Sequence, residues 1–154
     1  MRDNFMAKRR KIVAIVEDDP SMLRATRDLL DAHGFATVAF ASAQAFLARR
    51  TLEKVGCLLL DIDLGGMSGI ELRRQLKVSS PGLPIIFMTG LDDDSIERQA
   101  LEVGCVALLR KPFTQGELIE AINKAEPQRK KMARAFSRLP GDATLKGVLP
   151  FAAQ

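Results

Sequence analysis

The sequence predicts an α/β protein in which a parallel sheet is covered by helices on both faces. Three observations lead to this prediction: five short apolar runs rich in branched residues, a helical pattern of about ten residues after each run, and turn residues between them. Strands that alternate with helices form parallel sheets, because a right-handed crossover helix packs back onto the sheet that it left. With 154 residues, 47% of them apolar, the chain is long enough for one such domain with short tails.

The first unit begins with residues 12–16, a continuously apolar run of the kind found in strands buried on both faces. Three acids follow this run, and the last of them, Asp19, precedes Pro20. Asp and Pro are typical of the N-cap and the first position of a helix, and apolar residues then recur at helical spacing until Gly34. The pattern predicts a strand, an acidic turn and a helix.

Four further units repeat this arrangement. Strands are predicted over 36–40, 57–61, 85–89 and 106–109, and the helices that follow them over 42–47, 70–79, 95–103 and 115–124.

Polar residues follow the predicted strands where each strand ends. In a parallel sheet these carboxyl ends meet at one edge, and ligands bind there. The residues expected to gather at this edge are Glu17, Asp18, Asp19, Asp61, Thr89, Arg110, Lys111 and Pro112.

This set of side chains points to phosphate chemistry. Adjacent carboxylates repel one another, and a divalent cation relieves the conflict. The available ligand atoms are all oxygens, which favours Mg²⁺ over Zn²⁺. A carboxylate is also a nucleophile that forms an aspartyl phosphate when the incoming phosphoryl oxygens are neutralised. Here Mg²⁺, the Lys111 ammonium and the Thr89 hydroxyl are each available to one such oxygen.

At these residues the chain resembles the receiver domains of bacterial response regulators, in particular those of nitrogen-fixation-type regulators. The resemblance covers about residues 11–125 and includes five motifs in the same order. It implies a flavodoxin-like (βα)5 doubly wound sheet with strand order 2-1-3-4-5. It also implies a two-component switch in which Asp61 accepts a phosphoryl group from a sensor histidine kinase or a histidine phosphotransfer protein.

The resemblance also assigns the metal site. Asp18 is implied as a direct Mg²⁺ ligand and Glu17 as a ligand through water. Asp61 and the backbone carbonyl of Asp63 complete the set of Mg²⁺ ligands that the protein provides. Asp19 then serves mainly to cap the first helix.

The switch residues follow from the same resemblance. Thr89, which precedes Gly90, is the implied switch hydroxyl, and Lys111 is the phosphate-binding lysine. The bond between Lys111 and Pro112 is cis in this family, a form that X-Pro bonds adopt at modest cost. Phosphorylation would then alter the face formed by helix 95–103, strand 106–109 and helix 115–124, for partner binding or phosphorelay.

Two positions depart from the usual pattern of the family, and two more bear on phosphoryl lifetime. Leu108 stands where most members have an aromatic residue. In those members the ring turns inward on phosphorylation and passes the change to the output face, and Leu108 has no ring to do so. Gly65 stands in place of a proline, and we expect a looser loop there. Asp63 and Leu91 occupy positions that control the access of water to the phosphoryl group.

Charge divides the chain into three parts: a basic N-terminal tail over 1–10, a receiver domain over 11–125 and a basic C-terminal tail over 126–154. Residues 11–126 carry a net charge of −4, so nucleic-acid binding by the folded body is not expected. The 29 residues after Ala125 are too few for a helix-turn-helix output domain, which suggests a receiver acting alone. Three alternatives stay open for the C-terminal tail: a solvated disordered segment, a nucleic-acid-binding segment, or a helix to about residue 139 that docks a partner or forms a dimer. The helix would carry Met132, Phe136 and Leu139 on one face.

No apolar stretch reaches the roughly 20 residues of a membrane helix, and the start of the chain is not signal-like, so we expect a cytoplasmic protein without membrane insertion. Cys57 and Cys105 lie in apolar sequence without metal-site spacing and are expected in the core. His33, before Gly34, is expected in the last turn of the first helix.

Two other functions are compatible with parts of the sequence. Residues 58–63 resemble the DxD strand of haloacid-dehalogenase-type phosphatases, but in those enzymes this strand comes first and the metal-binding acids come late. A degenerate receiver that binds proteins without phosphorylation is kept open by Leu108. We therefore expect no enzyme beyond self-phosphorylation from small phosphodonors and self-dephosphorylation. A downstream protein target and a dimer through the switching face stay open as partners.

Overall fold

The computed structural model describes the backbone of residues 12–49 and 54–137, and the side chains of these residues as far as Glu126. Its elements, in chain order, are β1 (Ile12–Val16), α2 (Pro20–Ala32), β2 (Ala36–Phe40), α3 (Ala43–Leu47), β3 (Val55–Asp61), α4 (Gly69–Ser79), β4 (Ile85–Thr89), α5 (Asp94–Val103), β5 (Ala107–Arg110) and α6 (Gln115–Ser137). The predicted N-terminal tail and Leu139 lie outside the described residues.

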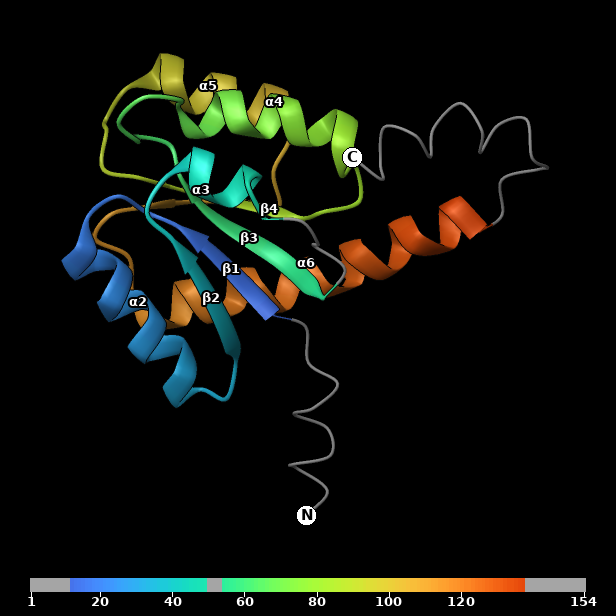
Figure 1. Ribbon diagram of the computed structural model, residues 1–154, viewed down its shortest axis with the longest axis horizontal. Helices are drawn as coiled ribbons and strands as arrows, with labels where there is room; N and C mark the ends of the chain where they lie inside the picture. Colours follow the sequence, from blue (N-terminus) through green and yellow to red (C-terminus); the bar gives the residue numbers. More distant parts are fainter. Residues whose placement is uncertain (1–11, 50–53, 138–154) are drawn as a thin grey trace.

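The five strands form one sheet in the order β2-β1-β3-β4-β5, and all neighbouring pairs are parallel. This confirms the predicted doubly wound α/β fold and its strand order. Figure 1 shows α3, α4 and α5 on one face of the sheet and α2 and α6 on the other.

Strands β1, β3, β4 and β5 each contribute to two apolar cores, because neighbouring residues of a strand point to opposite faces. In β1, Ala14 and Val16 pack on the face of α3, α4 and α5, whereas Val13 and Ile15 pack on the face of α2 and α6. A strand covered on both sides needs apolar residues at every position, which explains the continuous apolar runs in the sequence.

Several predicted boundaries differ from those in the structure. β3 begins at Val55, two residues early, because Val55 is buried and pairs with Ile12 across a register shift. β5 begins and ends one residue late, at Ala107–Arg110. α6 continues through Pro127 to Ser137, beyond the predicted helix 115–124 and close to the alternative end at about residue 139, because Lys, Arg and Ala favour helix strongly enough to continue it past the proline.

The helix ends of α2 agree with the sequence. Asp19 caps the first turn, where its carboxylate accepts hydrogen bonds from the N–H groups of Ser21 and Met22 at 2.9 and 3.4 Å. His33 is the C-cap, and its Nδ1 lies 2.9 Å from the carbonyl oxygen of Leu29.

The two cysteines are both free. Cys57 is buried, and burial raises the pKa of its thiol to about 12, as expected for a core residue. Cys105 is only half-buried and packs against the core beside α4 and α5.

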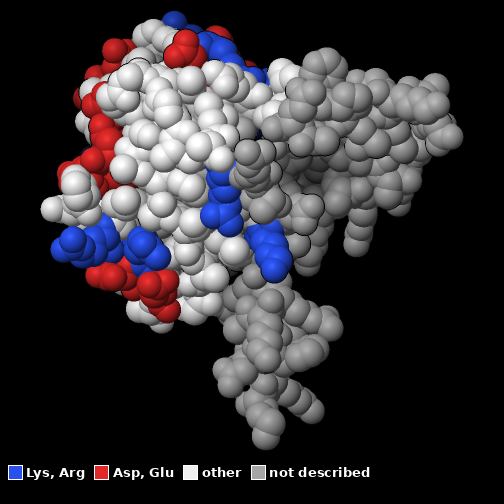
Figure 2. All heavy atoms as spheres, viewed as in Figure 1, with Lys and Arg blue, Asp and Glu red and all other residues white. Residues whose placement is uncertain are grey.

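Charged side chains are mixed over the described body. In the view of Figure 2, Lys and Arg side chains stand in separate groups, and acidic groups lie beside several of them. That face therefore offers no continuous basic surface. Among the described residues, no helix is both long enough and apolar enough to cross a membrane.

Candidate functional site

The strand register places the acids and the lysine at one edge of the sheet. Val16, the last residue of β1, pairs with Leu60, so Glu17 and Asp61 follow side by side. Thr89 pairs with Arg110 at the ends of β4 and β5, and the N–H of Lys111 donates to the carbonyl oxygen of Thr89 at 2.8 Å. These backbone contacts bring together residues that are far apart in the sequence.

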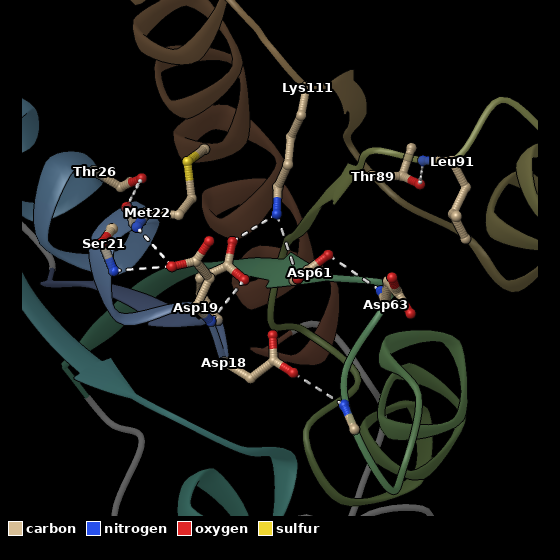
Figure 3. A network of polar contacts seen from close by, with 12 residues as sticks. Asp18, Asp19, Ser21, Met22, Thr26, Asp61, Asp63, Thr89, Leu91 and Lys111 are labelled. Atoms are coloured by element: carbon tan, nitrogen blue, oxygen red, sulfur yellow. Dashed lines mark hydrogen bonds and ion pairs between the residues drawn. The ribbon is translucent and has the colours of Figure 1, made fainter.

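The ammonium group of Lys111 lies between two carboxylates. Its Nζ is 2.6 Å from Oε1 of Glu17 and 3.3 Å from Oδ2 of Asp61 (Figure 3). Glu17 is 1% exposed and Asp61 3%, so both acids depend on this lysine for charge compensation. The predicted meeting of Lys111 and Asp61 at one end of the sheet is therefore observed.

Three carboxylates form the acidic cluster: Glu17, Asp18 and Asp61 each offer an oxygen, and these oxygens all lie within 4.8 Å of one another. Glu17 and Asp61 are buried, whereas Asp18 is exposed. The second oxygen of Glu17 accepts a hydrogen bond from the N–H of Asp19 at 3.3 Å. The cluster therefore has a buried side and a side open to solvent.

The carboxyl group of Asp61 has an unusually high proton affinity. Burial is the main cause, and the neighbouring Glu17 adds to it through a hydrogen bond and through its charge; together they raise the pKa of Asp61 to about 7. Lys111 and the N–H of Asp63, which donates to Oδ1 of Asp61 at 3.1 Å, oppose this rise in pKa. Added positive charge at this place would favour the ionised carboxylate.

Burial on its own would lower the pKa of Lys111, but its partners outweigh this effect. The hydrogen bond to Glu17 and the charges of Asp61 and Glu17 raise the pKa of the ammonium above its ordinary value. Lys111 is therefore a fixed positive charge beside Asp61.

The switch residues named from the sequence lie on the β4 and β5 side of the site. Thr89 is buried, and its Oγ1 accepts a hydrogen bond from the N–H of Leu91 at 3.0 Å. In Figure 3, Thr89 and Leu91 stand on the side of Asp61 away from Asp18. Leu91 and Gly90 are exposed, and a Cβ at Gly90 would meet nothing within 4 Å.

The fifth strand and the turn after it complete that side. Leu108 is half-buried and packs against the core on the α3, α4 and α5 face. The bond between Lys111 and Pro112 is cis, as the sequence predicted.

Two backbone contacts of the loop after β3 were not foreseen. The N–H of Gly65 donates to Oδ2 of Asp18 at 3.2 Å, although the two residues are 47 positions apart. At Gly69, a Cβ would lie only 2.3 Å from the carbonyl oxygen of Asp61 and 2.9 Å from Cα of Ile62. Glycines in a loop give a sequence signal for a turn, but not for a close approach to a particular residue.

The donor set fits Mg²⁺. Within the part of the chain that the structure describes, the candidate cluster consists of carboxylates alone, and hard cations bind such oxygens. Repulsion between Glu17 and Asp61 contributes to the raised pKa of Asp61, and a cation would relieve it.

Comparison with known proteins gives the class of this fold and site. A family model described as a response regulator receiver domain matches residues 13–123. The chain therefore belongs to the response regulator receiver family.

Curated relatives agree with this assignment. The chain is 35% identical over 137 residues to the response regulator protein TodT of Pseudomonas putida, a match that covers 87% of this chain and 60% of TodT. It is 35% identical over 127 residues to the transcriptional regulatory protein FixJ of Bradyrhizobium diazoefficiens, covering 80% of this chain and 62% of FixJ. The chain thus spans about three fifths of the length of these relatives.

Solved structures share the fold. A CheY-like receiver domain protein from Methanospirillum hungatei matches with a TM-score of 0.73 and 29% identity, over 80% of this chain and 98% of the other. The response regulator StyR matches with a TM-score of 0.75 and 36% identity, over 86% of this chain and 72% of the other. Receiver domains take phosphoryl groups from kinases and bind Mg²⁺ at an acidic pocket, and they are switches rather than conventional enzymes. The family membership sets aside the haloacid-dehalogenase alternative.

Proposed function

We propose that this chain is a phosphoacceptor switch in which Asp61 takes a phosphoryl group from a sensor histidine kinase or a histidine phosphotransfer protein. One observation supports this most directly: the Lys111 ammonium lies 3.3 Å from the Asp61 carboxylate, at a cluster of three carboxylates. A buried carboxylate beside a fixed cation and a candidate metal site is suited to accept a phosphoryl group.

The proposed step is a displacement at phosphorus. An Asp61 oxygen forms the new P–O bond, the P–N bond of the donor phosphohistidine breaks, and the imidazole leaves with the bonding electrons. Lys111 neutralises one phosphoryl oxygen, and Thr89 would offer its hydroxyl to another after it turns from the N–H of Leu91.

Glu17, Asp18, Asp61 and the backbone carbonyl of Asp63 are the proposed Mg²⁺ ligands. Bound Mg²⁺ would neutralise the carboxylates and one phosphoryl oxygen. The protein holds these groups in place before the reaction: Lys111 pairs with Glu17 and Asp61, and the N–H of Asp63 fixes the second oxygen of Asp61.

The proposed output surface is the face of α5, β5 and α6. Arg110 of β5 forms ion pairs with Asp92 and Glu97 on this face, so it links the loop after β4 to α5. Movement of Thr89 towards a phosphoryl group would release Leu91 and alter these contacts, while Leu108 repacks without an aromatic ring to turn. Binding of a protein target, phosphorelay and dimerisation through this face all fit the proposal, as does the cytoplasmic location expected from the sequence.

Leu108, which replaces the usual aromatic residue, favours a second candidate function: a receiver that binds its partner without phosphorylation. The two functions differ in one measurement. The protein is incubated with Mg²⁺ and acetyl phosphate, and its intact mass is recorded. We expect the gain of one phosphoryl group in the wild type and none in Asp61→Asn. A wild type that gains no phosphoryl group would contradict the switch and support the function that does not depend on phosphorylation.

A further inference from the structure

The loop after β4 is attached to the last residue of β5 by an ion pair. Nη1 of Arg110 lies 3.3 Å from Oδ1 of Asp92, and Nη2 of the same guanidinium forms a second ion pair with Oε2 of Glu97 in α5. The side chain of Asp92 is 97% exposed, whereas that of Glu97 is 37% exposed. The contact with Asp92 is therefore the weaker of the two, because water screens it more fully.

Arg110 itself is held by the sheet and by α5. It pairs with Thr89 in the register of β4 and β5, and the N–H of the next residue, Lys111, donates to the carbonyl oxygen of Thr89 at 2.8 Å. The ion pair with Glu97 attaches the guanidinium to α5. A movement of the loop after β4 would therefore separate Asp92 from Arg110 and would not carry Arg110 along.

The residue before Asp92 is bonded to the switch hydroxyl. The N–H of Leu91 donates to Oγ1 of Thr89 at 3.0 Å (Figure 3), and residues 90–93 are exposed throughout. When the hydroxyl turns towards a phosphoryl group on Asp61, this bond is lost and the loop is free to move. The ion pair of Asp92 thus belongs to the conformation in which the hydroxyl is bonded to Leu91.

We propose that the ion pair between Arg110 and Asp92 restrains the switch: it stabilises the conformation in which Thr89 is bonded to Leu91, and so opposes phosphorylation of Asp61. This inference rests on the proposed function, because it takes Asp61 as the phosphoacceptor. A contact made in only one of two conformations shifts the equilibrium between them by its own free energy. An exposed ion pair changes an equilibrium constant by about 1.5- to 5-fold, so this one adjusts the rate of phosphorylation and leaves the chemistry unchanged.

The rate of phosphorylation by acetyl phosphate at saturating Mg²⁺, followed by intact mass, tests the inference. Asp92→Asn keeps the shape of the side chain and removes its charge, and its rate should rise about 1.5- to 5-fold because the competent conformation is more populated. Asp94→Asn is the matched control, since Asp94 is also exposed and forms no ion pair within the described part of the chain. Its rate should equal that of the wild type. An unchanged or lower rate in Asp92→Asn, or an equal gain in Asp94→Asn, would overturn the proposal.

A double-mutant cycle separates the ion pair from other effects of charge. In an Arg110→Ala background, Asp92→Asn should no longer change the rate, because the partner is missing. The Mg²⁺ dissociation constant of Asp92→Asn, measured by calorimetry, should stay within about twofold of the wild type, because Asp92 is not part of the acidic cluster. A gain in rate that persists without Arg110, or one that is accompanied by a larger change in Mg²⁺ affinity, would overturn the proposal.

Failure of the inference differs from failure of the proposed function. A wild type that takes up no phosphoryl group would count against the phosphoacceptor function of Asp61. A wild type that is phosphorylated, together with an Asp92→Asn variant of equal rate, would count against the restraining ion pair alone.

Discussion

The two loops that frame the acidic site leave the same edge of the sheet but are held in different ways. Residues 62–68, after β3, include the buried Leu64, donate to Asp18 and lead into Gly69 against the backbone of Asp61. Residues 90–93, after β4, are exposed throughout. Their described contacts are the bond from the N–H of Leu91 to Thr89, the cap that Asp93 provides for α5, and an exposed ion pair with Arg110.

This difference separates two tasks within one site. A metal site needs ligands that stay in place, and the loop after β3, which the sequence predicted to be looser at Gly65, makes backbone contacts to Asp18 and Ile62. A switch needs a segment whose contacts are few and easily exchanged, and the loop after β4 has this character. We infer that conformational freedom is concentrated on the Thr89 side, and that changes on the two sides should have unequal effects.

The largest expected effect is the pH dependence of stability that Asp61, at the end of β3, should cause. The pKa of Asp61 is raised from 3.8 to about 7, so between these values the folded state holds a proton that the unfolded state has lost. Without metal, the free energy of unfolding should therefore fall as pH rises from about 4 to about 7, by at most about 1.4 kcal/mol per pH unit. Urea unfolding in EDTA at a series of pH values measures this slope.

Asp61→Asn is the control for this prediction, since it removes the titrating group. The difference in stability between the wild type and Asp61→Asn should vary with pH over the same window, and saturating Mg²⁺ should abolish the decline in the wild type. A difference that stays constant with pH would mean that Asp61 titrates near its ordinary pKa.

The two loops are compared directly by adding the same methyl group to each, at Gly69 after β3 and at Gly90 after β4. Gly69→Ala would put a Cβ 2.3 Å from the Asp61 carbonyl oxygen, and it should lower the free energy of unfolding by about 1–3 kcal/mol and weaken Mg²⁺ binding. Gly90→Ala meets nothing within 4 Å and should change stability by no more than about 0.5 kcal/mol. Urea unfolding and calorimetry measure both effects, and equal behaviour of the two variants would break the comparison.

The sequence predicted the fold because its signals are local and repeated. The apolar runs, the Asp19 cap and the stop at Gly34 each reflect a preference of a few neighbouring residues, and five repeats leave few alternatives. For the end of the last helix, the sequence left open whether the residues after 124 extend it, and the structure continues α6 to Ser137.

The candidate site was predicted in part. Acids and a lysine at strand ends follow from the rule that parallel strands end at one edge, and the register brings Glu17, Asp61 and Lys111 together. The contacts of Gly65 and Gly69 could not be predicted, because both depend on backbone groups. Every glycine has a backbone N–H and lacks a Cβ, so the sequence does not show which glycine uses these features.

The smallest expected effect compares the helix caps at which the two loops end. Ser68 caps α4 by accepting from the N–H of Glu71 at 3.2 Å, and Asp93 caps α5 by accepting from Ser95 and Ile96 at 2.8 and 3.3 Å. Ser68→Ala and Asp93→Ala should each lower the free energy of unfolding by about 1 kcal/mol. Only Ser68→Ala should also weaken Mg²⁺ binding, because α4 begins at Gly69, which is bonded to the end of β3. Calorimetry on both variants decides this: a similar loss of Mg²⁺ affinity in Asp93→Ala would show that the loop after β4 supports the metal site as firmly as the loop after β3.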